Sequence, residues 1–223
     1  DRVLAEAGGH EGHEGHSDHG EEAHDDGDHE VHNEQGHEAV QEDHDHDHSD
    51  GRIDPHAWLD PANARHWVGL IAETLAAEDP ANADQYRDNA EAVRADIEAM
   101  TADIRAAVEP VSDVPFVVFH DAYQYFERRF GMNTVGAISL SDASDPSPAH
   151  IAEIRTVVDR HDVQCVFAEP QFNPQLVETV LDGTDARTGV LDPMGSDIAV
   201  GEGFYATLIS QLGERLVTCL EGS

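Results

Sequence analysis

The sequence predicts an α/β fold whose C-terminal lobe holds a four-stranded, mainly parallel sheet flanked by helices. Three observations predict this fold class. Four short apolar runs alternate with helical segments in the second half of the chain, a long helix with continuous apolar periodicity precedes them, and a polar, low-complexity tract opens the chain. Strands separated by helices of roughly 10–15 residues indicate βαβ units, which build parallel sheets covered on both faces.

The opening tract, residues 1–52, consists mainly of Gly, His, Asp and Glu without apolar periodicity. Such a segment cannot form a core, so we expect a disordered loop. Neutral imidazole is a common ligand of zinc, copper and nickel, so the tract is predicted to bind metal weakly at several sites, with a charged solubilising linker as the alternative. Eleven of the 16 histidines lie here: His10, His13, His16, His19, His24, His29, His32, His37, His44, His46 and His48.

Both the opening tract and the rest of the chain are strongly acidic. The net charge of −35 divides into −17 for residues 1–50 and −18 for residues 51–223. This acidity argues against nucleic acid or an anionic membrane as partner and favours cations. No apolar run approaches the ~18 residues of a membrane span, so direct membrane insertion is not expected. Because the chain begins inside a low-complexity tract, we expect a fragment whose upstream part is missing.

Two helices are predicted between the tract and the sheet. Asp60 can cap the first, with Pro61 at its first position. One side of this helix carries four large apolar side chains: Trp67, Leu70, Ile71 and Leu75. Asp79-Pro80 starts a second helix over 81–108 with apolar residues spaced by three and four. At ~1.5 Å per residue it would be roughly 40 Å long, which suits a brace between two lobes.

Four strands and four helices follow in alternation. We expect strands at 115–119, 134–138, 163–168 and 188–191. We expect helices at 121–130, 148–160, 173–181 and 203–220.

Polar side chains stand where three of these strands end. His120-Asp121, Glu169 and Asp192 each follow a strand directly. Ligands of open α/β sheets gather at the carboxyl ends of strands, so these residues form a candidate metal site. Asp121 could instead, or as well, cap the following helix, and Glu169 could support a ligand rather than bind metal itself.

Other signals for chemistry are weak or missing. His56 precedes a helix beside Trp58, which alone says little. The sequence has no HExxH, GxSxG, P-loop or GxGxxG motif, so no enzyme class is indicated. Cys165 and Cys219 are either two small buried apolar residues or one disulfide across a long loop.

Four stretches resemble the zinc-specific periplasmic solute-binding proteins of ABC importers: DPHAWLDP (54–61), FVVFHDAYQYFERRFG (116–131), CVFAEPQFNP (165–174) and GVLDPMGSDI (189–198). The resemblance runs from about residue 53 to 223, and residues 1–52 resemble the His-rich, acidic loop of zinc importers. It implies that His56, His120 and Asp192 ligate Zn²⁺ and that Cys165 pairs with Cys219.

The resemblance also implies two α/β lobes joined by a long helix. Residues 53–79 would be the remainder of an N-terminal lobe, 80–109 the inter-lobe helix, and 110–223 the metal-binding C-terminal lobe. The N-terminal lobe, with a further zinc ligand, would lie upstream of Asp1.

The predicted function is high-affinity capture of Zn²⁺ in the periplasm by a monomeric protein that is not an enzyme. The protein would deliver zinc to an ABC transporter permease in the inner membrane, with the His-rich loop as a weak reservoir or sensor. The alternatives are a manganese or iron receptor and a metal-dependent adhesin of the same family, and, from another class, a zinc-dependent hydrolase.

Overall fold

A computed structural model describes residues 54–139 and 146–222. The His-rich tract, with its 11 predicted metal-binding histidines, lies outside these described residues. Residues Ile53–Ser223 make one compact unit by their mutual contacts. Among the described helices, none combines the length and apolarity needed to cross a membrane.

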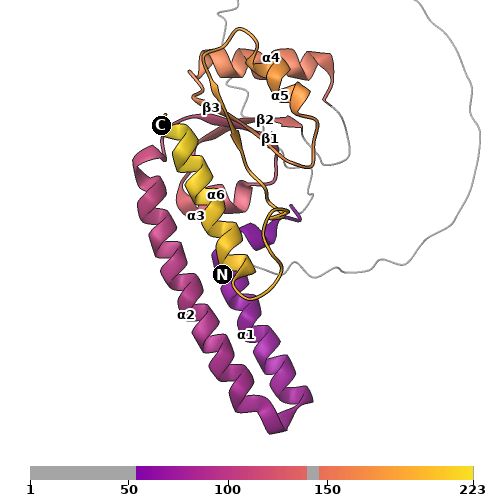
Figure 1. Ribbon diagram of the computed structural model, residues 1–223, viewed down its shortest axis with the longest axis vertical. Helices are drawn as coiled ribbons and strands as arrows, with labels where there is room; N and C mark the ends of the chain where they lie inside the picture. Colours follow the sequence, from indigo (N-terminus) through magenta and orange to yellow (C-terminus); the bar gives the residue numbers. More distant parts are fainter. Residues whose placement is uncertain (1–53, 140–145, 223) are drawn as a thin grey trace, which may run out of the picture. The chain divides into compact units, whose positions relative to one another are not determined.

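A four-stranded sheet with all neighbours parallel forms the centre of this unit (Figure 1). Its strands lie in the order β2-β1-β3-β4. They comprise β1 (Phe116–His120), β2 (Thr134–Ser139), β3 (Cys165–Ala168) and β4 (Arg187–Val190). The predicted fold class, with its four strands, is therefore confirmed.

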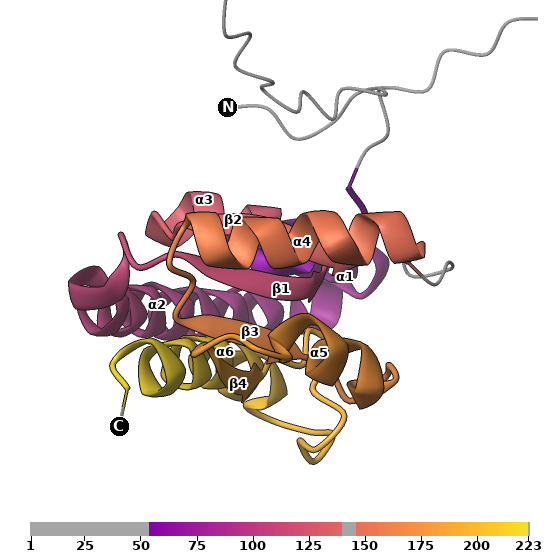
Figure 2. The same cartoon turned by 90° about the horizontal axis from the view of Figure 1, so that it is seen from above.

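Helices cover both faces of the sheet, as Figure 2 shows from above. The alternation of side chains along β1 explains the two layers: Phe116 and Val118 belong to one apolar cluster, and Val117 and Phe119 to the other. The helices that follow the strands are α3 (Gln124–Phe130), α4 (Pro148–Arg160), α5 (Pro174–Leu181) and α6 (Phe204–Leu220). α4 and α5 pack on one face, and α3 and α6 on the other, so the inner strands β1 and β3 are buried between them.

Two helices at the start of the unit lie side by side and extend away from the sheet (Figure 1). α1 (Pro61–Glu78) begins as predicted, because the Asp60 carboxylate accepts a hydrogen bond from the Ala62 N–H at 2.8 Å. α2 (Ala83–Val108) follows a short 3₁₀ turn, η2 (Pro80–Asn82). Only the C-terminal half of α2 is buried, and it packs against α6.

The apolar side of α1 is not the side that the rest of the unit covers. Leu70, Ile71 and Leu75 are 53%, 57% and 43% exposed, whereas the small side chains of Ala72 and Ala76 are buried. Alanine lets the backbones of α1 and α2 approach closely. Periodicity identified an apolar side of the helix, but it could not identify the side that faces α2.

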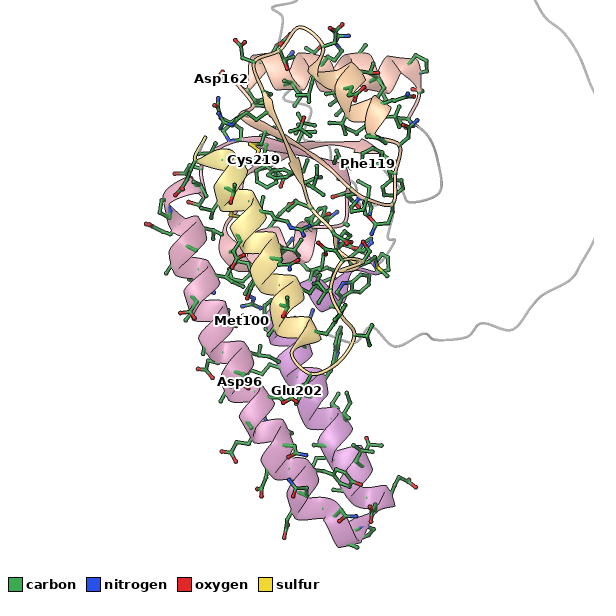
Figure 3. The ribbon with its side chains drawn as sticks, in the orientation of Figure 1. Asp96, Met100, Phe119, Asp162, Glu202 and Cys219 are labelled. Carbon is green, nitrogen blue, oxygen red and sulfur yellow. A yellow bond between two sulfur atoms is a disulfide. The ribbon has the colours of Figure 1, made fainter. Side chains whose placement is uncertain are left out.

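A disulfide joins Cys165 on β3 to Cys219 near the end of α6 (Figure 3). Both residues are buried. The bond therefore fixes the last helix to an inner strand of the sheet. The predicted pairing is confirmed.

Candidate metal site

The carboxyl edge of the sheet carries the polar residues predicted for it. His120 is the last residue of β1, Glu169 follows β3, and Asp192 follows β4 by two residues. All three are at least 96% buried. Polar side chains of this kind stay in an interior only when they have hydrogen-bonding or ionic partners.

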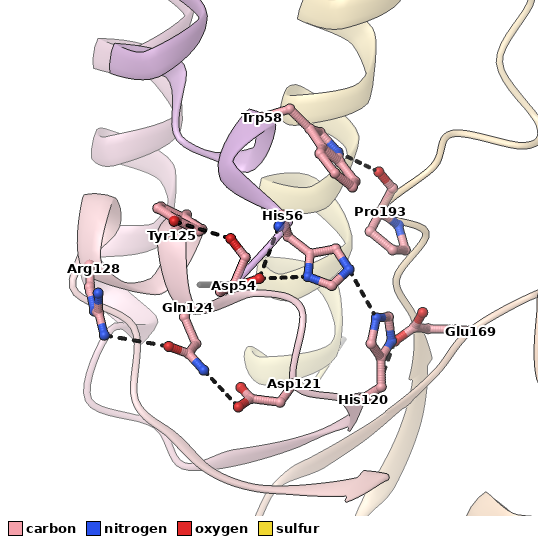
Figure 4. A network of polar contacts seen from close by, with 10 residues as sticks. All are labelled: Asp54, His56, Trp58, His120, Asp121, Gln124, Tyr125, Arg128, Glu169 and Pro193. Carbon is pink, nitrogen blue, oxygen red and sulfur yellow. Dashed lines mark hydrogen bonds and ion pairs between the residues drawn. The ribbon is translucent and has the colours of Figure 1, made fainter. Parts of the chain in front are cut away.

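A second histidine meets His120 at this edge. His56 directly precedes the 3₁₀ turn η1 (Ala57–Leu59) and is buried. Its Nε2 atom lies 3.4 Å from Nε2 of His120, with the two ring planes inclined by 66° (Figure 4). The structure thus brings together two imidazoles that stand 64 residues apart in the sequence.

A carboxylate stands behind each of these rings (Figure 4). Oδ1 of Asp54 lies 2.7 Å from Nδ1 of His56, and Oε1 of Glu169 lies 2.6 Å from Nδ1 of His120. An ionised carboxylate can only accept hydrogen bonds, so each carboxylate favours the tautomer of its ring that carries the proton on Nδ1. The lone pair of each ring is then on Nε2, where a metal ion can be bound.

The segment that carries His56 is fixed to the sheet domain. Because side chains of α3 and α6 and a carbonyl of the β4–α6 loop hold it, His56 keeps its position beside His120. The contacts are the hydrogen bonds Trp58 Nε1–H to Pro193 O (3.0 Å), Tyr205 O–H to Trp58 O (2.9 Å) and Tyr125 O–H to Asp54 O (3.2 Å), with a two-point ion pair between Arg129 and Asp60 (2.6 and 2.7 Å).

Asp192 is held away from the two imidazoles by donors of its own. Its carboxylate accepts hydrogen bonds from Gln171 Nε2, from the backbone N–H of Met194, and from both N–H and O–H of Ser196, at 2.6–3.0 Å. Burial raises the pKa of Asp192, but these hydrogen bonds together outweigh burial, so the pKa lies below its ordinary value. Within residues 54–139 and 146–222, no three His, Cys, Asp or Glu side chains are grouped so as to hold a metal ion.

Asp121 does not cap the helix after β1. The chain turns at this residue, where the N–H of Ala122 bonds the carbonyl of His120 at 2.8 Å, and α3 starts only at Gln124. The carboxylate of Asp121 instead accepts a hydrogen bond from the Gln124 side chain at 2.7 Å (Figure 4). The predicted capping role was therefore wrong, because a turn separates the strand from the helix.

Aromatic rings enclose the two imidazoles. The ring centroid of Phe172 lies 5.4 Å from that of His120, and the ring centroid of Trp58 lies 5.2 Å from that of His56. Tyr123 also faces His120, and burial, followed by the charge of Glu169, raises the pKa of its hydroxyl well above the ordinary value. His56 and His120 are both buried among these rings, and burial strengthens electrostatic interactions at the edge of the sheet.

Comparison with known proteins identifies the family of the chain. Residues 5–219 match the family model described as ZnuA, zinc-uptake complex component A, periplasmic. The chain belongs to this family. Its ZnuA relative from Brucella abortus (strain 2308), named a high-affinity zinc uptake system protein, is 45% identical over 170 residues. That match covers 76% of this chain and 51% of the relative, so the chain spans about half the length of the curated relative.

Two solved structures in this fold are similar as well. A mutant structure of the laminin-binding adhesin Lmb from Streptococcus agalactiae has a TM-score of 0.67 and 30% identity, and the match covers 75% of this chain and 63% of that one. A crystal structure of ZnuA has a TM-score of 0.66 and 25% identity, with 75% of this chain and 62% of that one covered.

Asp54 is the functional candidate that the sequence reasoning missed. The signal was present, because an Asp before Pro commonly accepts a hydrogen bond from the backbone two residues later. Here the Asp54 carboxylate accepts from the backbone N–H of His56 at 2.9 Å as well as contacting its ring. The same turn therefore orients both the backbone and the imidazole of His56.

Proposed function

We propose that the chain captures Zn²⁺ through Nε2 of His56 and Nε2 of His120, as part of a periplasmic zinc receptor. The observation that carries the proposal is the pair of buried Nε2 atoms 3.4 Å apart, each on a ring whose Nδ1 faces a carboxylate. Zinc is the cargo of such a protein, which binds and releases it without chemical change.

The spacing of the two nitrogens suits tetrahedral zinc. With Zn–N bonds of about 2.0–2.1 Å, neighbouring nitrogen ligands of a tetrahedral ion lie about 3.3–3.4 Å apart. Imidazole ligands also favour zinc over manganese, which prefers oxygen. Both points support zinc over the manganese or iron alternative.

Asp192 is proposed as a third ligand, with Glu169 as a support for His120 rather than a ligand. Asp192 is kept ionised at the same edge of the sheet, and the family resemblance points to this carboxylate. Glu169 touches the Nδ1 side of His120, which is the side away from a metal at Nε2. For Asp192 to bind zinc, at least one of its present hydrogen bonds must be exchanged for the metal.

The setting in the cell is part of the same proposal. A monomeric receptor in the periplasm would pass zinc to an ABC transporter permease in the inner membrane. The family description supports the periplasm and zinc uptake, and the name of the Brucella relative supports high-affinity zinc uptake. Residues 1–52 would act as a weak zinc reservoir or sensor, and α1 and α2 would belong to the junction with an N-terminal lobe. No catalytic step is proposed.

Calorimetric titration of the full chain with Zn²⁺ tests the ligand set. We expect His56→Gln and His120→Gln each to lower the affinity of one tight site about 100-fold or more, and Asp192→Asn to lower it less, because Asn keeps a carbonyl oxygen. His66→Gln, an exposed histidine of α1, is the matched control. Unchanged tight binding in the His56 and His120 variants would contradict the proposal.

The division between tract and site has its own test. A chain without residues 1–52 should keep the tight site and lose only weaker ones, because the proposed ligands all lie beyond residue 53. Loss of tight binding together with the tract would show that the ligands had been assigned to the wrong region.

Adhesion is the second candidate function, favoured by the similarity to the laminin-binding adhesin. Binding of the chain to immobilised laminin would support this function. The His56→Gln variant, whose zinc affinity should be lower, shows whether laminin binding depends on the metal.

A further inference from the structure

We infer that Asp54 and Glu169 are positioning residues that hold the protons of His56 and His120 on Nδ1 and favour a divalent over a monovalent ion. The inference deepens the proposed zinc function and rests on it. It assigns to Asp54 a role in the site, and it makes the two carboxylates a matched pair rather than separate structural contacts.

Each carboxylate is anchored to the histidine that it orients. Asp54 Oδ1 accepts from both the backbone N–H and the ring of His56, at 2.9 and 2.7 Å. Glu169 Oε1 lies 2.6 Å from Nδ1 of His120 and accepts a longer, 3.4 Å hydrogen bond from the backbone N–H of the same residue. The two rings are thus supported in the same way, although one lies on a loop and the other on a strand.

The two carboxylates oppose a state of the site in which the two imidazoles hydrogen-bond to each other. A neutral imidazole can carry its proton on either nitrogen. If one ring moved its proton to Nε2, it could donate a hydrogen bond directly to the other Nε2, which is only 3.4 Å away. That bond would occupy both metal-binding atoms. The carboxylates oppose this state because they give Nδ1–H a strong acceptor on each ring.

With both protons on Nδ1, two lone pairs point toward each other. A cation between them would be attracted to both, so the arrangement is electrostatically suited to a metal ion. Preorganisation of this kind lowers the reorganisation that binding would otherwise require.

The charges of the two carboxylates favour a divalent ion. The side chain of Glu169 is 1% exposed and that of Asp54 17% exposed. The second oxygen of Asp54, Oδ2, is buried without a hydrogen-bond partner in the described part of the chain, and the carboxylate of Glu169 is buried beside the hydroxyl of Tyr123. Negative charge so placed is poorly screened and stabilises a nearby cation. Together with Asp192, the two carboxylates carry −3 beside two neutral rings, so a divalent ion is attracted more strongly than a monovalent ion such as Ag⁺.

Proton positions can be read directly by long-range ¹H–¹⁵N NMR of the histidine rings. The sample is the full chain with the eleven tract histidines replaced by glutamine, metal-free at pH 8, where imidazole is neutral. We expect Nδ1 to be the protonated nitrogen in both rings of this parent chain. Asp54→Ala should shift the His56 ring to a mixture of tautomers and leave the His120 ring unchanged. Glu169→Ala should do the reverse.

Metal affinity gives the second readout. We expect Asp54→Ala and Glu169→Ala to weaken Zn²⁺ binding about 10- to 100-fold. Asp54→Asn keeps an acceptor oxygen, so it should largely restore the tautomer of His56. Because it removes the charge, it should still lower the ratio of Zn²⁺ to Ag⁺ affinity, by about tenfold. A merely structural role would not separate the tautomer from the charge in this way.

A matched control lies on α4, where Glu153 pairs with His150 at the surface, 3.4 Å from its Nδ1. Glu153→Gln should leave Zn²⁺ affinity unchanged. Protons on Nε2 in the parent chain, or unaltered tautomers in both alanine variants, would overturn the inference. If the parent chain failed to bind zinc at all, the proposed function would fail, whereas the metal-free tautomers decide the positioning roles separately.

Discussion

His120 and His56 lie 3.4 Å apart but are held there by different kinds of structure. His120 ends an inner strand whose side chains are all buried, so the core of the sheet fixes it. His56 lies on a short loop, where hydrogen bonds from side chains of α3 and α6 act together with the buried side chain of Leu59. Two histidines of one site can thus be held in place by different parts of the fold. Mutations in the sheet and mutations around the loop should therefore have different effects on stability and on zinc affinity.

The largest expected effect is on the sheet that supports His120. Replacing Cys165 and Cys219 by serine opens a cross-link that spans 54 residues. In the chain-entropy model this lowers the free energy of unfolding by about 4 kcal/mol. Urea unfolding with and without reductant measures the loss, which reductant alone should reproduce in the wild type. A wild type that is insensitive to reductant would show that the cross-link contributes little.

The next effect is a pH dependence located on α3, the helix that holds the loop of His56. Burial raises the pKa of Glu127 to about 7, although hydrogen bonding with the side chain of Thr134 acts in the opposite direction. Because the folded pKa exceeds the unfolded value of 4.5, the folded state binds more protons between these values. Stability therefore falls as the pH rises from about 4.5 to 7.

Glu127→Gln removes this titration. We expect the variant to be more stable than the wild type at pH 8, by up to about 3 kcal/mol, and nearly equal to it at pH 4. Urea unfolding at the two pH values is the measurement. Equal stability differences at pH 4 and pH 8 would show that Glu127 titrates normally.

The smallest effect on stability should come from the support of His56. Arg129→Met keeps the aliphatic stem but removes the ion pair to Asp60, at a cost of about 1 kcal/mol, because the pair is partly exposed. Zinc affinity should nevertheless fall by about tenfold, since the loop that carries His56 loses an anchor. Arg215→Met, which breaks the Arg215–Asp197 pair elsewhere, is the control and should leave affinity unchanged. Similar zinc affinities for the two variants would show that the ion pair between Arg129 and Asp60 does not help to position His56.

Much of the fold could be predicted because short apolar runs alternate with helical segments along the sequence. α4 and the start of α1 were predicted to the residue, since Ser147 and Asp60 cap them ahead of a proline. The rule for carboxyl ends of parallel strands also placed His120, Glu169 and Asp192 at one edge before the structure was known. These features depend on local chemistry and on topology, both of which a sequence carries.

The contacts between distant segments could not be predicted in the same way. The residues alone left His56 without a role, because its neighbours in space come from α3, α6 and the loop after β4. α3 began three residues later than expected, since a turn at Asp121 separates it from β1. The exposed side of α1 likewise depends on which helix packs against it.

The indole of Trp58 gives the site an optical consequence. The chain has only two tryptophans, and the ring of Trp58 lies 5.2 Å from that of His56 while its N–H bonds the carbonyl of Pro193. A divalent ion arriving at His56 changes the electric field across this indole. Intrinsic fluorescence therefore reports occupancy in real time, without a label, once Trp67 has been replaced by phenylalanine.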